Sequence, residues 1–101
     1  MISDKLYLYK GETLLGTLQL KEVDQPWFIC SFSPTAAFEE VKPLFDRELE
    51  LLNAGDSEED AWEEIMGQID ALKLRLTEAE NGNNIEEFLL HIQNDEAWFR
   101  Y

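Results

Sequence analysis

The sequence has little cysteine and little positive charge. A single cysteine, Cys30, among 101 residues excludes an internal disulfide framework. Eight lysines and arginines stand against 22 aspartates and glutamates, which gives a formal net charge of −14. Such a chain repels nucleic acid, so a protein that binds DNA or RNA by neutralising phosphates is excluded.

Long hydrophobic runs are also missing. No apolar stretch reaches the roughly 18–20 residues of a membrane-spanning helix. Residues 1–10 lack the charged and apolar regions of a secretory signal peptide. We therefore expect no membrane association and a cytoplasmic localisation. At 45% hydrophobic residues the chain has enough apolar side chains for one core, so we expect a single domain over residues 1–101.

A two-residue periodicity over residues 5–33 predicts three antiparallel strands. Leu6 and Leu8 alternate with Lys5 and the tyrosines beside them, and a similar alternation follows a turn at Gly11. Gly16, inside the second of these segments, predicts a bulge or a close backbone approach. Residues 21–26 are polar and are expected to form a turn before the third strand.

A helical periodicity replaces this pattern over residues 34–71. Pro43 interrupts the first apolar stripe, which predicts a kink or a short helix before a longer one. Gly55 is expected to follow the end of that helix, and Asp56 or Ser57 to begin the next. The second helix has the clearest stripe, which consists of Trp62, Ile65, Met66 and Ile69.

Residues 72–101 return to a period of two, with turns at 80–84 and at 94–95. The predicted order is therefore βββ-αα-βββ. This order indicates an α+β fold with an antiparallel sheet of about five to six strands and two helices packed on one face.

Acidic residues concentrate in the helical segment. Between Glu39 and Glu64 there are eleven acids and two basic residues, so this segment carries −9 of the net charge. Because the acids lie between apolar stripe positions, we expect them to face solvent. They form either a solvated face, or a recognition surface for a basic protein, or a mimic of nucleic-acid charge. The acidic candidates for an interaction surface are Glu48, Asp56, Glu58, Glu59 and Glu63.

Several aromatic side chains fall opposite the leucine positions of the strands. If the helices cover one side of the sheet, these aromatic residues line the other side, and an open face of this kind favours homodimerisation. The alternative is that the strands curl and bury them. The candidates on this face are Tyr7, Tyr9, Trp27, His91, Trp98 and Arg100.

Signals for catalysis or metal binding are weak, and we predict no catalytic residue, cofactor or metal site. The acidic run at 56–60 lacks the glycine of a calcium loop, because Ala61 stands at that position. Cys30 lies in an apolar strand without the electropositive setting of a reactive thiolate. His91 is expected to be a strand histidine hydrogen-bonded to a neighbour. The alternative is a small-ligand site or an enzyme site near His91, Trp98, Arg100 and Tyr101.

Two segments carry a resemblance. Residues Phe32–Phe38 have the pattern F-x-P-T-x-A-F, and residues Asp95–Tyr101 read D-E-A-W-F-R-Y. Together with the opening at Leu8–Gly16, they resemble a group of small acidic bacterial proteins in which similar segments bracket an acidic helical middle. The resemblance implies a free-standing bacterial protein and implies no activity. From the weak catalytic signals and the clustered acidic and aromatic residues, we expect a non-enzymatic protein-binding or regulatory module that uses its acidic helical face or its aromatic sheet face.

Overall fold

A curled antiparallel sheet makes up most of the fold in this computed structural model, which describes residues 2–54 and 59–101. Seven strands occur in these residues, in the spatial order β5-β4-β1-β2-β3-β7-β6. The strands are β1 Lys5–Lys10, β2 Thr13–Asp24, β3 Trp27–Pro34, β4 Leu74–Glu78, β5 Asn84–Ile85, β6 Leu89–Gln93 and β7 Glu96–Arg100.

The predicted α+β class is confirmed, whereas the expected five to six strands underestimate the sheet of the described chain. The additional strand is β5, which pairs with β4 through Leu76–Ile85 and Thr77–Asn84. Two residues are too few for any periodicity to show. The polar turn is shorter than the expected residues 21–26, because β2 continues to Asp24 and pairs with β3 across a bulge. Backbone pairing at the exposed end of a hairpin requires no apolar side chains.

Between β3 and β4, the described residues form three helical segments: the 3-10 helix η1 Ala36–Glu40, α1 Lys42–Ala54 and α2 Glu59–Ala71. The break expected at Pro43 is confirmed, since η1 ends before Val41 and Pro43 lies in the first turn of α1. Proline is tolerated there because the first backbone N–H groups of a helix have no partner within it. The expectations for Gly55, Asp56 and Ser57 fall on residues outside those described.

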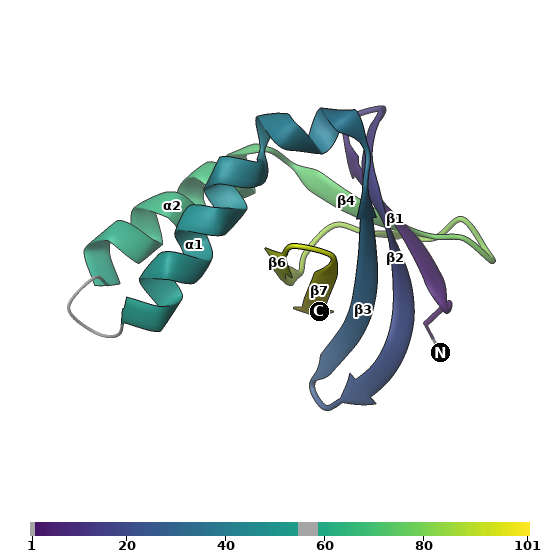
Figure 1. Cartoon of the computed structure of the whole chain (residues 1–101). Helices are drawn as coiled ribbons and strands as arrows, with labels where there is room; N and C mark the ends of the chain where they lie inside the picture. The colour runs from purple at the N-terminus through teal and green to yellow at the C-terminus, as the bar shows by residue number, and fades with distance from the viewer. Residues whose placement is uncertain (1, 55–58) are drawn as a thin grey trace.

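The two long helices lie side by side, to one side of the β1–β2–β3 meander (Figure 1). Strand β6, at the edge of the sheet, lies next to α1. Helix α2 packs mainly on α1 and makes few contacts with strands. The helices therefore form a second layer beside the β6 edge instead of both covering one sheet face. As a result, much of the surface of α2 is available to solvent.

The concave side of the sheet holds the hydrophobic core. Alternate residues of each strand point inward, as Leu6 and Leu8 do on β1 and Leu90 and Ile92 do on β6. Phe38 of η1 and Phe45 of α1 close the core from the helical side, with ring centroids 6.0 Å apart. The leucine alternation in the sequence is the direct cause of this arrangement.

The prediction for Gly16 is confirmed in both respects. The β1–β2 register shifts next to it, between Leu8 and Tyr9. A Cβ atom at Gly16 would lie 2.5 Å from Cζ of Phe32 and 3.0 Å from the carbonyl oxygen of Ser33. Glycine therefore allows the Phe32 ring to lie directly on the β2 backbone.

Candidate functional site

A buried carboxylate–imidazole pair joins the helical layer to the sheet. Oε1 of Glu48, on α1, lies 2.6 Å from Nδ1 of His91, on β6. The other carboxylate oxygen, Oε2, accepts a hydrogen bond of 3.1 Å from the indole N–H of Trp62, on α2. The side chain of Glu48 is completely buried and that of His91 is 6% exposed. One carboxylate thus connects three elements that are far apart in the sequence.

Aromatic rings enclose the imidazole of His91. Its centroid lies 5.4 Å from that of Trp27, on β3, and 5.5 Å from that of Trp98, on β7. The guanidinium group of Arg100 lies 5.3 Å from the Trp27 ring, and Arg100 is itself exposed. The side chains follow the strand register, in which His91 stands directly opposite Trp98. The polar pair is therefore shielded from water by half-buried indole rings.

The position of Glu48 corrects the expectation that this acid faces solvent. Phe45 lies three residues before it and Leu51 three residues after it, and both are buried. Residues at this spacing share a helix face, so Glu48 belongs to the apolar side of α1. An acid at such a position needs a hydrogen-bonding partner inside the protein. This helical spacing was the signal in the sequence that could have identified Glu48 as part of a buried site.

For His91, the expected hydrogen bond is present, but its partner comes from a helix and not from a neighbouring strand position. A carboxylate at Nδ1 orients the ring and favours a proton on that nitrogen, which leaves Nε2 as the nitrogen that could accept a proton or bind a ligand. Trp98 lies beside this histidine, and Arg100 lies over the ring of Trp27, which is itself next to His91. Tyr101 does not, because its ring stacks on Phe28 with centroids 5.7 Å apart and is 66% exposed.

The aromatic sheet face expected from the sequence consists of two separate patches. One is the group around His91, on β3, β7 and β6. The other is on β1, where Tyr7 and Tyr9 are half-buried and a guanidinium group, that of Arg75, lies 4.8 Å from the Tyr9 ring. Polar residues of β2 and β3, such as the register partners Gln19 and Ser31, lie between the two patches. The aromatic residues thus do not form one continuous interface.

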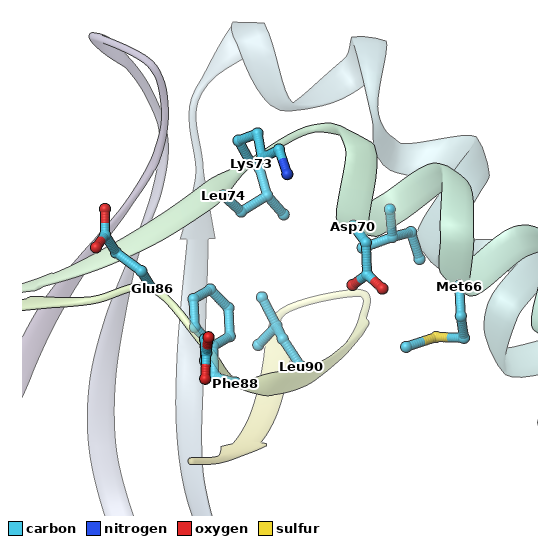
Figure 2. Close-up of a pocket in the computed structure, with 9 residues that line it drawn as sticks. Met66, Asp70, Lys73, Leu74, Glu86, Phe88 and Leu90 are labelled. Carbon is cyan, nitrogen blue, oxygen red and sulfur yellow. The ribbon is translucent and has the colours of Figure 1, made fainter.

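A pocket of about 370 Å³ lies between the end of α2, the start of β4 and the segment that precedes β6 (Figure 2). Its apolar lining combines buried and half-buried residues from these elements, namely Met66, Ile69, Leu74, Phe88 and Leu90. Its charged lining is predominantly acidic and consists of Asp70, Glu86, Glu87 and Lys73. Met66 and Ile69 were recognised in the sequence as helix-stripe residues. The pocket itself could not be, since it depends on how α2 meets β4 and β6.

The charges of α1 and α2 differ in how far they are compensated. On α1, Nζ of Lys42 lies 2.8 Å from Asp46, and Arg47 lies 3.8 Å from Glu50. The hydrogen bond from Lys42 to Asp46 raises the pKa of the lysine. Helix α2 contains no lysine or arginine, and its exposed acids are Asp60, Glu63, Glu64 and Asp70. The candidates Asp56 and Glu58 lie outside the described residues, as does the side chain of Glu59.

Cys30 lies on the core side of β3 and is fully buried. Burial raises the pKa of its thiol to about 11, against a smaller opposing effect of Lys21. The thiol therefore stays protonated near neutral pH and is a poor nucleophile. Within residues 2–54 and 59–101, no three His, Cys, Asp or Glu side chains are arranged to hold a metal ion. Across the same residues, no helix is long and apolar enough to span a bilayer.

Comparison with known proteins gives no match: neither a family model, nor a curated protein, nor a solved structure is significantly similar to this chain. The resemblance carried by Phe32–Phe38 and Asp95–Tyr101 thus stays a prediction.

Proposed function

We propose that the protein is a non-enzymatic binding module that recognises a basic protein partner through the acidic outer face of its helical layer. The observation that carries this proposal is the charge of α2. Among its described side chains this helix has four exposed carboxylates, and its sequence contains no basic residue, whereas both cations of α1 are paired with acids of α1. The α2 face is therefore an uncompensated negative surface.

Because of their spacing, these acids repel one another and lower the stability of α2 when no partner is bound. Asp60 lies three residues before Glu63 and four before Glu64, so these side chains are neighbours on the helix. Like charges at these spacings destabilise a helix by a few tenths of a kcal/mol each. Lysine and arginine side chains of a partner would relieve this repulsion and accelerate association, most strongly at low salt.

The test compares capture of a partner by two charge variants of the full chain. The first variant, Asp60→Asn/Glu63→Gln/Glu64→Gln, removes three charges from α2. The control, Glu12→Gln/Asp24→Asn/Glu80→Gln, removes three exposed charges elsewhere, so its net charge equals that of the α2 variant. A basic protein is first captured by the wild type and identified by mass spectrometry. Its dissociation constant for the control is expected to lie within about threefold of that for the wild type. The α2 variant should bind it at least tenfold more weakly.

Two results would contradict the proposal. One is equal loss of binding in both variants, which would mean that net charge and not the α2 face attracts the partner. The other is binding that does not weaken between 0.05 and 0.5 M salt, at which exposed charges are largely screened. If the captured protein binds nucleic acid, competition with DNA for it would favour the more specific function of a nucleic-acid mimic.

A second candidate function is a small-ligand or enzyme site at His91. It is favoured by the Glu48–His91 hydrogen bond, because a carboxylate that orients an imidazole is a common arrangement in catalytic and ligand-binding sites. A thermal-shift screen with metal ions and metabolites tests it against His91→Ala. A stabilising ligand that acts on the wild type and not on the variant would support this function, and its absence would count against it.

A further inference from the structure

We propose that the pocket at the end of α2 receives one apolar side chain of a basic segment of the partner, and so anchors a complex that the acidic surface attracts. This inference rests on the proposed function, because it identifies where and how the basic partner docks. It draws on three observations: the lining of the pocket, the charge at its rim, and its position on the acidic face of α2.

The pocket is roomy and apolar enough to admit a side chain such as leucine, isoleucine, methionine or phenylalanine. The pocket volume of about 370 Å³ lies at the lower end of the range for ligand sites. Ile69, Leu74 and Leu90 form a floor that is continuous with the hydrophobic core. Met66 and Phe88 are half-buried, so they expose apolar surface that a ligand would cover.

The rim indicates the charge of the ligand. Three carboxylates, on Asp70, Glu86 and Glu87, and the single ammonium group of Lys73 border the pocket. All four side chains are exposed to solvent. Figure 2 shows the Asp70 carboxylate and the Phe88 ring on opposite sides of the hollow. An apolar group flanked by lysine or arginine is complementary to this combination, whereas an acidic ligand is not.

The pocket also lies on the surface already assigned to the partner. Glu63, Met66 and Asp70 are spaced three and four residues apart, so they follow one another along one face of α2. The uncompensated acids thus run directly to the mouth of the pocket. A partner segment lying along α2 would place its cations on Glu63 and Asp70 and an apolar residue beside Met66. Interfaces commonly combine one such buried anchor with a charged surround.

The test uses two labelled peptides with helical spacing of lysine and leucine. They have the same charge, and in the second peptide alanine replaces every leucine. By fluorescence anisotropy at 0.1 M salt, the wild type is expected to bind the leucine peptide at least tenfold more tightly than the alanine peptide. Met66→Trp fills the mouth of the pocket and keeps every carboxylate. This variant should bind the leucine peptide at least fivefold more weakly and the alanine peptide unchanged.

A second measurement locates the site. In ¹⁵N-labelled protein, the leucine peptide is expected to shift amide resonances of residues 66–74 and 86–90 most strongly. The double variant Glu86→Gln/Glu87→Gln should weaken both peptides, whereas the control Glu12→Gln/Glu80→Gln should weaken neither by more than twofold. Far-UV circular dichroism verifies that each variant is folded.

The outcomes separate this inference from the function on which it rests. If leucine and alanine peptides bind equally and Met66→Trp has no effect, the anchor is wrong, although an acidic docking surface would stand. If Asp60→Asn/Glu63→Gln/Glu64→Gln leaves the alanine peptide binding unchanged, the docking surface is wrong. Resonance shifts confined to residues outside 66–74 and 86–90 would also overturn the anchor.

Discussion

Oε1 of Glu48 and Nδ1 of His91 lie 2.6 Å apart, although 43 residues separate them in the sequence. Glu48 also accepts the N–H of Trp62, so its carboxylate holds α1, α2 and β6 together. Nothing else in the described chain links these three elements through one polar group. The helical layer that carries the acidic surface is therefore positioned by a buried hydrogen-bonded carboxylate.

Glu48→Ala should lower the free energy of unfolding by about 3 kcal/mol, because it leaves buried polar groups of His91 and Trp62 without their acceptor. Urea unfolding followed by circular dichroism measures the loss. The matched control is Glu50→Ala, two residues further along α1, which is exposed and should change stability by less than about 0.5 kcal/mol. A loss of similar size in both variants would mean that a general effect of removing a carboxylate from α1, and not the buried contact, is responsible.

The double variant Glu48→Leu/His91→Leu should recover part of the stability lost in Glu48→Ala. Replacing both partners of this buried pair by apolar groups removes the unsatisfied imidazole together with the carboxylate, and the recovery is partial because the indole N–H of Trp62 still lacks its acceptor. The interaction free energy from a double-mutant cycle between Glu48 and His91 is expected to be about 1–3 kcal/mol. Additive single-variant effects would show that the two side chains are not energetically coupled.

Two glycine substitutions should have opposite effects. Gly16→Ala would place a Cβ atom against the Phe32 ring, and forcing a methyl group into a packed core costs about 1–3 kcal/mol. Gly67→Ala introduces a methyl group with no neighbour within 4 Å on exposed α2, and should stabilise by about 1 kcal/mol through helix propensity. Thermal denaturation distinguishes them. A stabilised Gly16→Ala protein would disprove the close approach of Phe32 to β2.

The sequence allowed the strands of the core to be predicted because burial on one side imposes alternation. Leu6 and Leu8 on β1, for example, are both fully buried. The helix break at Pro43 could also be predicted, because a proline acts on the local backbone. Local patterns could not place α2 on α1 instead of on the sheet. That arrangement follows from how β6 and β7 fold back to the sheet edge, a contact between residues far apart in sequence.

The candidate sites also differ in how far a local sequence pattern could identify them. His91 and Trp98 could be grouped because the alternation of each strand places them on the same face of the sheet, and the β6–β7 pairing sets them opposite one another. Glu48 was assigned to the solvent side because its charge outweighed its position among apolar residues. The pocket combines Met66 of α2 with Phe88 from the segment before β6. No local pattern relates these two residues, so the pocket becomes visible only in three dimensions.

Thr35→Val should destabilise the protein by about 1 kcal/mol, whereas Thr35→Ser should have little effect. The hydroxyl of Thr35 donates to the carbonyl oxygen of Leu14 at 2.6 Å, and its backbone N–H donates to that of Leu15 at 2.8 Å. These bonds attach the start of η1 to β2. Valine keeps the shape of threonine and loses the hydroxyl donor. Chemical denaturation of the two variants provides the measurement, and equal stability would exclude a role for the hydroxyl.

We predict that Cys30 lowers the free energy of unfolding at alkaline pH. Burial raises the pKa of the thiol from 9.0 to about 11, so the unfolded chain loses this proton at a lower pH than the folded one. Below about pH 9 the thiol is protonated in both states and its contribution to stability is complete. Between about pH 9 and 11 the unfolded state binds fewer protons, and the free energy of unfolding therefore falls as pH rises.

The loss attributable to Cys30 should approach about 2 kcal/mol at the upper end of this range. Tyrosines and lysines also titrate there, so the wild type must be compared with Cys30→Ala. The variant is less stable at pH 8 because it leaves a small cavity, but its stability should decline less steeply between pH 9 and 11. A thiol reagent at pH 8 should label native Cys30 at the rate of unfolding. Identical pH slopes, or rapid labelling of the folded protein, would show that the thiol is accessible to water.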